Sequence, residues 1–195
     1  MAELVPMKSA LDGVLMPGNF GAENPDGPGV TFSERQSLHV YHLSGDLNDA
    51  RFPTAARHAI SLPLPMSAGE TRDTGGTRVL WLGPDRWLIT ATSPLDLSAL
   101  TEIAAVNDVT AGRLILRLSG PKCRDLLAKG SPLDLNPAMF KAGHCAQTLV
   151  GALSVTLDCV AADGFDLYVT RSHALFFWEW LSRAANEFGY RVEAA

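Results

Sequence analysis

Three cysteines carry the strongest potential for nucleophilic chemistry in this sequence: Cys123, Cys145 and Cys159. Cys123 falls in the first turn of a predicted helix, where the helix dipole lowers a thiol pKa and favours the reactive thiolate. The alternative is burial, because Cys123 precedes Leu126 and Leu127 at the spacing of one apolar helix face. We favour burial for this cysteine and for the other two, which lie in strand-like segments. An odd number of cysteines without a C-x-x-C pair also indicates reduced thiols rather than a disulfide or metal framework.

The histidines and turn aspartates do not form a catalytic or metal-binding pattern. The five histidines are dispersed, and His39 and His42, three apart in an extended segment, should point to opposite faces of a strand. Zinc requires three or four converging ligands. Asp85, Asp108 and Asp163 fall in or beside turns, where an aspartate usually stabilises its own backbone. We therefore expect neither a metal site nor a catalytic residue in this chain.

The sequence also lacks the glycine-rich loops that hold nucleotides. No G-x-G-x-x-G follows a predicted strand, and no G-x-x-x-x-G-K-[ST] occurs. Without such a backbone cradle, the chain is not expected to bind a dinucleotide cofactor such as FAD or NAD by itself.

Charge and hydropathy exclude further classes of function. The net charge is -5, the isoelectric point is near 5.5, and the basic residues are scattered, so we expect no binding to nucleic acid or to an anionic membrane. The most apolar stretch, 174–181, is interrupted by Glu179 and is too short to span a bilayer. Prolines and charges interrupt residues 1–20 before they could form a secretory signal. The sequence therefore predicts a soluble, cytoplasmic protein.

The order of predicted elements indicates an α+β fold. Glycines and prolines crowd residues 18–29, which indicates an irregular N-terminal arm over 1–29. A first group of elements follows: a strand (37–43), a helix (51–60), a hairpin (78–82 and 87–92), a helix (93–105) and a strand (106–109).

The rest of the chain repeats this βαββαβ order. Its elements are a strand (113–119), a helix (121–129), a hairpin around Asp163-Gly164 (154–160 and 165–170), a helix (173–188) and a strand (190–193). The tripeptide L-S-G ends the first strand of each group, at 43–45 and 118–120. We therefore predict two ferredoxin-like halves, 30–110 and 111–195.

The last helix carries the most informative surface pattern. A core-facing seam at alternating spacings of four and three residues comprises Ala174, Trp178, Leu181, Ala185 and Phe188. Phe176 and Trp180 fall on the opposite face among charged residues. Exposed aromatic pairs mark protein interfaces, so we predict a partner contact at Phe176 and Trp180. The alternative is that another segment of the same chain covers them.

Short motifs along the chain resemble those of a known family. They are W-L-G-P-D-R-W-L at 81–88, D-V-T-A-G-R at 108–113, L-S-G-P at 118–121, L-L-A-K-G at 126–130, C-A-Q-T at 145–148 and W-E-W-L at 178–181. In this order they resemble the gamma subunit family of heterotetrameric sarcosine oxidase. The first motif is also similar to one in the folate-binding fold of glycine-cleavage aminomethyltransferase, so the combination is the more specific feature.

The resemblance implies a fold like the N-terminal region of that aminomethyltransferase. It also implies a complex with alpha, beta and delta subunits that oxidatively demethylates sarcosine. The products implied are glycine, hydrogen peroxide and, with tetrahydrofolate, 5,10-methylenetetrahydrofolate. FAD, FMN and NAD are implied for the large subunits, and no catalytic residue is implied for the gamma-type chain.

Three other functions stay open at this level. The chain could be the small subunit of a related N-methyl amino acid dehydrogenase complex. A free-standing folate-dependent aminomethyltransferase-like protein would bind tetrahydrofolate as an isolated chain. A regulator that binds a small molecule between the two halves would be stabilised by its ligand.

Overall fold

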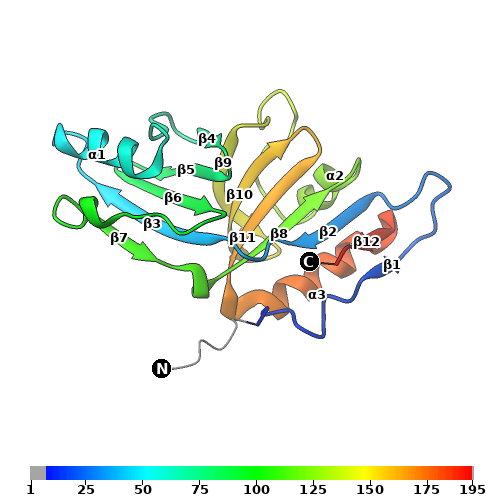
Figure 1. Ribbon diagram of the computed structural model, residues 1–195. Coiled ribbons are helices and arrows are strands. Elements are labelled where there is room, and N and C mark those ends of the chain that lie inside the picture. The colour runs from blue at the N-terminus through cyan, green and yellow to red at the C-terminus, as the bar shows by residue number, and fades with distance from the viewer. Residues whose placement is uncertain (1–7, 195) are drawn as a thin grey trace, which may run out of the picture.

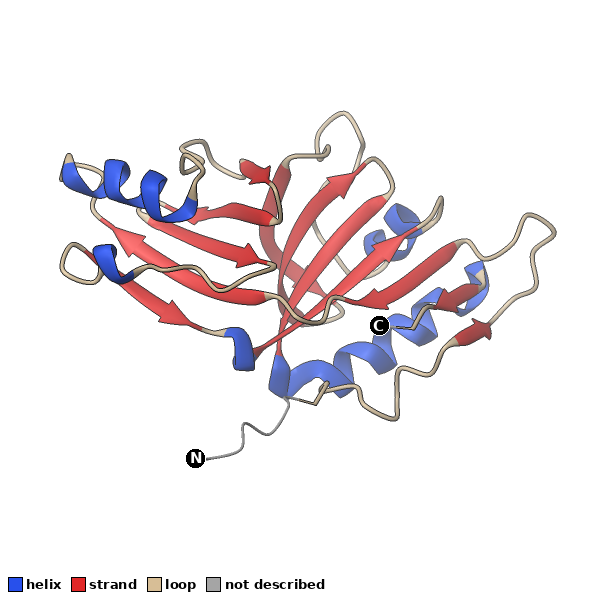
Figure 2. Ribbon diagram, in the orientation of Figure 1, coloured by secondary structure: helices blue, strands red, loops and turns tan. Residues whose placement is uncertain are grey.

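Two β-sheets lie face to face in this protein, and helices cover their outer faces (Figures 1 and 2). The computed structural model describes residues 8–194. Helix α1 (Arg51–Ile60) packs outside one sheet, and α2 (Cys123–Ala128) and α3 (Ala174–Ala185) pack outside the other. This arrangement confirms the predicted α+β class.

The first half of the chain forms a five-stranded antiparallel sheet. Its spatial order is β4 (Thr71–Thr74), β5 (Thr77–Gly83), β6 (Arg86–Ala91), β3 (His39–Gly45) and β7 (Ala104–Asp108). Without β4, this order is that of a ferredoxin-like unit. Phe52 of α1 and Trp87 of β6 are both fully buried, with ring centroids 5.6 Å apart, and they hold the helix against the sheet.

A seven-stranded sheet contains the second ferredoxin-like unit. Its order is β1 (Gly18–Phe20), β12 (Tyr190–Val192), β2 (Val30–Glu34), β8 (Arg113–Ser119), β11 (Gly164–Thr170), β10 (Leu153–Ala161) and β9 (His144–Val150). Strand β2 lies between β12 and β8, parallel to the first and antiparallel to the second. An N-terminal segment thus completes the sheet of the C-terminal half.

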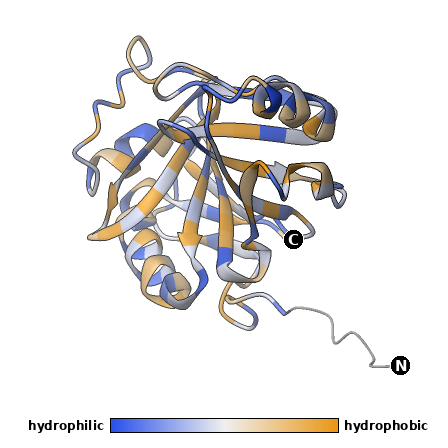
Figure 3. Cartoon of the chain, turned by 90° about the vertical axis from the view of Figure 1, so that its left-hand side faces the viewer, coloured by the Kyte–Doolittle hydropathy of each residue, from blue (hydrophilic) through white to orange (hydrophobic). Residues whose placement is uncertain are grey.

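Hydropathy alternates along many of the strands (Figure 3), because successive side chains point to opposite faces. In β8, Leu114, Leu116 and Leu118 face the helices, whereas Ile115 faces the other sheet. The layer between the sheets has a small apolar cluster, which comprises Val40, Leu80, Leu88, Ile115, Cys145 and Tyr168. The layer also contains charged residues, which are described below.

One predicted helix is wrong. Residues 93–105 form only a short 3₁₀ turn at Ser98–Leu100, although the N-capping sequence is present. Strand β7 already begins at Ala104 and pairs with β3, and the segment before it buries Leu97 and Leu100 in the core of the first sheet. Tertiary pairing has overridden local propensity here.

The N-terminal arm is also more ordered than its composition suggests. Leu11 is 1% exposed and belongs to the core beneath α3, and residues 18–20 form β1. Within the arm predicted for 1–29, of which 1–7 lie outside the described residues, Leu11 is therefore part of the core. The domain boundary at residue 30 stays a prediction. Residues 30–34 nevertheless form β2, which pairs with β8 in the sheet of the second half.

Among the described residues, no helix has both the length and the apolar character that crossing a membrane requires.

Candidate functional site

The two aromatic residues predicted as a partner contact have different environments on α3. Phe176 is 55% exposed, beside Leu175 at 52%. Trp180 is only partly exposed, because its indole ring packs over Gly130 and Gly151 and against the core beneath the helix. The expected exposure is confirmed for Phe176 and wrong for Trp180, which loops of the same chain cover. The role of either residue at an interface stays a prediction.

This difference gives a direct test of the two side chains in the full chain. Trp180→Ala should lower the free energy of unfolding by about 2 kcal/mol, since it opens a cavity beside two glycines that cannot fill it. Phe176→Ala should change the free energy of unfolding by less than about 0.5 kcal/mol, as for most exposed positions. Urea unfolding followed by tryptophan fluorescence and circular dichroism measures both. Equal losses for the two variants would contradict this assignment.

The strongest electrostatic feature lies between the sheets. Asp158 of β10 is fully buried and accepts two hydrogen bonds from Arg78 of β5, at 2.5 Å from Nε and 2.6 Å from Nη2. Asp166 of β11 lies directly opposite Asp158 and is bound by both Nε and Nη2 of Arg117 from β8. Two bidentate arginine–aspartate pairs therefore stand side by side in the layer between the sheets.

Only one of these pairs joins the two sheets. Arg78 extends from the five-stranded sheet to Asp158 in the seven-stranded sheet, and its Nη2 also donates to Thr71 at 2.9 Å. Burial raises the pKa of Asp158 to about 6 against the opposing effect of Arg78. Because Arg78 and Asp158 satisfy one another, the pair is suited to fix the sheets relative to each other rather than to transfer protons to a substrate.

All three cysteines are buried, as favoured from the sequence. Burial raises the pKa of Cys123 and of Cys145 to about 12 each, and it also raises the pKa of Cys159. The thiolate that nucleophilic catalysis needs is therefore disfavoured at all three positions. The short helix does not activate Cys123, because desolvation raises the pKa of its thiol more than Arg124 and the backbone amides lower it.

Thiol chemistry can check this directly. In the native chain at pH 8, an aromatic disulfide reagent should react with these cysteines at least about 100-fold more slowly than in the unfolded chain, because it requires an exposed thiolate. The released thiolate is measured by absorbance with and without denaturant. Rapid reaction of one native thiol would restore the nucleophile hypothesis for that residue.

Of the aspartates predicted in or beside turns, Asp108 binds an amide two residues away, as expected, whereas Asp85 binds the amide of a distant loop. Asp85 accepts a hydrogen bond from the Leu47 amide, and Asp108 accepts one from the Thr110 amide. Within residues 8–194, no three His, Cys, Asp or Glu side chains gather as metal ligands would.

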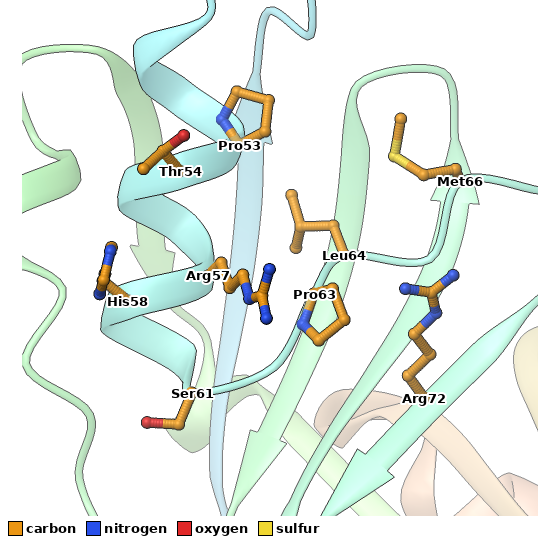
Figure 4. Close-up of a pocket in the computed structure, with 9 residues that line it drawn as sticks. All are labelled: Pro53, Thr54, Arg57, His58, Ser61, Pro63, Leu64, Met66 and Arg72. Carbon is orange, nitrogen blue, oxygen red and sulfur yellow. The ribbon is translucent and has the colours of Figure 1, made fainter.

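A groove of about 710 Å³ lies between α1 and residues 61–66 (Figure 4). Arg57 points from α1 into this groove, whereas His58 points away from it. Arg72 lines the opposite side, where it forms an ion pair with Glu70 at 2.7 Å, and the nearby Met66 is 56% exposed. Arginine and methionine are enriched at protein contacts, so this groove is a second candidate contact surface.

Comparison with known proteins identifies the family. The model of the sarcosine oxidase gamma subunit family matches residues 44–187. The chain belongs to this family. It is 33% identical to sarcosine oxidase subunit gamma of Corynebacterium sp. (strain U-96) over 137 residues, 67% of each chain. It is 34% identical to the corresponding subunit of an Arthrobacter sp. over 119 residues, which cover 54% of this chain and 58% of the relative.

Solved structures agree with this membership of the gamma subunit family. A chain of heterotetrameric sarcosine oxidase from Corynebacterium sp. U-96, in complex with pyrrole 2-carboxylate, matches with a TM-score of 0.77 and 30% identity, over 82% of this chain and 85% of that one. Aminomethyltransferase T of the glycine cleavage system from Bartonella henselae matches with a TM-score of 0.60 and 14% identity, over 87% of this chain and 48% of that one. The second likeness shows the fold alone. The resemblance drawn from the motifs is thereby confirmed.

Sequence reasoning missed the buried ion pairs. The available signal was an aspartate in the middle of each strand of the second hairpin, at Asp158 and Asp166, since aspartate is depleted in strands. The Asp163-Gly164 turn between them sets a register in which they face each other. Nothing in the sequence indicates that Arg78, 80 residues before Asp158, is the partner.

Proposed function

We propose that this chain is the gamma subunit of a flavin-dependent heterotetrameric sarcosine oxidase, in which it has a structural role beside alpha, beta and delta subunits. The observation that carries the proposal is the match over most of the chain to a chain of heterotetrameric sarcosine oxidase. The complex would demethylate sarcosine in the cytoplasm, with O2 reduced to hydrogen peroxide, glycine formed and the methyl carbon released as formaldehyde. With tetrahydrofolate it would also form 5,10-methylenetetrahydrofolate.

Two further observations support a structural role. The cysteine thiols are buried with raised pKa values, and the buried aspartates Asp158 and Asp166 are each held by an arginine. Apolar side chains remain exposed on α3 and beside the α1 groove, where large subunits could pack. We propose that FAD, FMN and NAD bind to those large subunits and not to this chain.

Purification of the tagged full chain from its native cytosol tests the proposal. The chain should bring down larger, yellow, flavin-containing subunits that produce hydrogen peroxide when sarcosine is added. A lone colourless monomer would contradict it. Turnover of another N-methyl amino acid without sarcosine turnover would indicate a related dehydrogenase complex. Binding of tetrahydrofolate with methyl transfer by the isolated chain would indicate an aminomethyltransferase-like enzyme.

Phe176 provides the residue-level prediction for assembly. Phe176→Asp should reduce the yield of assembled complex about tenfold, because a charge would be buried in an apolar contact. The melting temperature of the isolated chain should stay within about 2 °C, since the side chain is exposed. Met139→Asp, at a position that is 63% exposed, is the matched control and should assemble normally. Normal assembly of Phe176→Asp would remove this residue from the interface.

A further inference from the structure

Three arginines gather at one end of neighbouring strands in the seven-stranded sheet. Arg35 follows β2, Arg113 begins β8, and Arg171 follows β11. Because β2 and β11 both run antiparallel to β8, the C-terminal ends of β2 and β11 and the N-terminal end of β8 lie at the same end of the sheet. Adjacent strands are about 4.8 Å apart. The three side chains line one pocket of about 330 Å³, which we call the arginine pocket.

The walls of the arginine pocket come from several separate segments. The N-terminal arm contributes Lys8, whose backbone carbonyl accepts a hydrogen bond from Arg171. Glu34 is the acidic lining residue, and its carboxylate accepts hydrogen bonds from Ser9 at 2.6 Å and Gln36 at 3.3 Å. Its contacts are therefore with neutral donors. The pocket lining holds three arginines and a single carboxylate, whereas the Lys8 ammonium is largely exposed and lies 3.9 Å from Asp12.

These arginines differ from Arg78 and Arg117 because, among the described residues, no neighbouring carboxylate neutralises their charge. Among residues 8–194, no carboxylate lies within 4.0 Å of the guanidinium nitrogens of Arg35, Arg113 or Arg171. Arg78 and Arg117 each hold an aspartate instead. All three arginines of the pocket are nevertheless partly buried.

The contacts of the Arg113 guanidinium are with residues outside the lining of the arginine pocket, and none of them is acidic. The guanidinium contacts Nε2 of His42 at 3.2 Å and Oγ1 of Thr170 at 3.3 Å, which are uncharged or weakly basic partners. Burial lowers the pKa of Arg113 and of the adjacent His42. Grouping like charges in a half-buried concavity is unfavourable unless an anion neutralises them, and such a concavity concentrates anions from solution.

We propose that the arginine pocket binds a small anion with at least two negative charges on carboxylate or phosphate groups. The planar fork of each guanidinium matches the geometry of these groups and binds them with two parallel hydrogen bonds. The volume is that of a small-molecule site. The lining residues come from the N-terminal arm and from three strand ends, so the pocket is enclosed on several sides. Such a shape suits a compact ligand better than an extended peptide. The proposal does not depend on the structural role proposed for the chain.

Calorimetric titration of the full chain tests the proposal with two probes, citrate and inorganic phosphate. Sodium chloride is adjusted to keep the ionic strength constant, so that nonspecific screening does not change. At least one probe should bind saturably at a single site and raise the melting temperature. Binding of citrate without phosphate would assign the ligand to the carboxylates, and the reverse result would assign it to the phosphates.

Charge-removing variants then locate the site. Arg35→Gln and Arg113→Gln should each weaken binding of the probe at least about tenfold, as expected for loss of one charge-assisted contact. Arg183→Gln, which removes an exposed charge on α3, is the matched control and should bind as the wild type does. If a glutamine variant fails to fold, the NMR signals of His42 in the wild-type chain give the second measurement, and they should shift during the titration.

Several results would overturn the proposal. They are the absence of saturable binding of both probes, undiminished binding by both glutamine variants, and unchanged His42 signals at saturation. If neither probe binds but Arg35→Gln and Arg113→Gln lower the yield of assembled complex, the pocket receives an acidic side chain of a partner subunit instead of a small anion.

Discussion

Replacing Asp158 with alanine should lower the free energy of unfolding by about 3 to 5 kcal/mol, because the substitution leaves Arg78 buried without its bidentate partner. The Arg78 side chain is only 15% exposed, and the nearest alternative carboxylate, Asp73 at 3.3 Å, is largely solvated. Replacement of both partners by apolar residues, Arg78→Met with Asp158→Leu, should be less destabilising than the sum of the single losses. Urea unfolding of Asp158→Ala, of the double variant and of its two single substitutions measures these losses.

A surface pair supplies the matched control for this prediction. Arg72 and Glu70 form an ion pair at 2.7 Å, but both side chains remain partly exposed, so Arg72→Ala should cost less than about 1 kcal/mol. Similar losses for Asp158→Ala and Arg72→Ala would show that the pair between the sheets has no special role.

The same aspartate gives stability a defined dependence on pH. Burial raises the pKa of Asp158 from 3.8 to about 6 in the folded state, so between these values the folded chain retains a proton that the unfolded chain has released. The free energy of unfolding should therefore fall, by about 3 kcal/mol in total, as pH rises through this window, and Asp158 adds no further change above it. Asp158→Asn should lose this component of the pH dependence, which denaturation at pH 4, 5, 6 and 7 would reveal. An unchanged slope in that variant would contradict the assignment to Asp158.

Gly120→Ala should destabilise the chain by about 3 kcal/mol. Gly120 has φ of +117°, a conformation that side chains rarely adopt, and an added Cβ would lie 2.6 Å from the carbonyl oxygen of Gly29. Both effects act on the backbone, which cannot move aside as a flexible side chain could. This close approach lies where the chain enters β2, next to β8, so the variant should loosen β2 first. Hydrogen exchange of the β2 amides and urea unfolding measure the two effects.

Gly112 provides the control for this substitution. An added Cβ there meets no atom within 4 Å, and its φ is not in the left-handed region, so Gly112→Ala should be nearly neutral or slightly stabilising. Equal effects at Gly112 and Gly120 would mean that the contact with Gly29 is not the cause.

The repeated L-S-G tripeptide illustrates how far local pattern extends. Both tripeptides end the first strand of a ferredoxin-like unit, as predicted. The reason for each glycine is nevertheless different, because at Gly45 a side chain would collide with the ring of Phe52, whereas at Gly120 it would collide with backbone. The pattern predicts the position of the strand end, but only the packed neighbours explain the glycine.

The sequence by itself determined most strands and three of the four predicted helices, because alternating or helical apolar spacing and strong turn residues act over a few neighbours. The helix at Arg51–Ile60 and the strand at Arg113–Ser119 have the predicted bounds. The burial of the cysteines and the membership of the gamma subunit family also followed from local pattern and motifs.

Tertiary structure decided what depends on distant partners. It placed β2 in the sheet of the second half, replaced the helix predicted at 93–105 by a 3₁₀ turn and strand β7, and covered Trp180 with two glycine-containing loops. It also joined Arg78 to Asp158 and assembled the arginine pocket. Such contacts join residues far apart in the chain, and the spacing of residues along a sequence carries no information about which strand ends will meet in space.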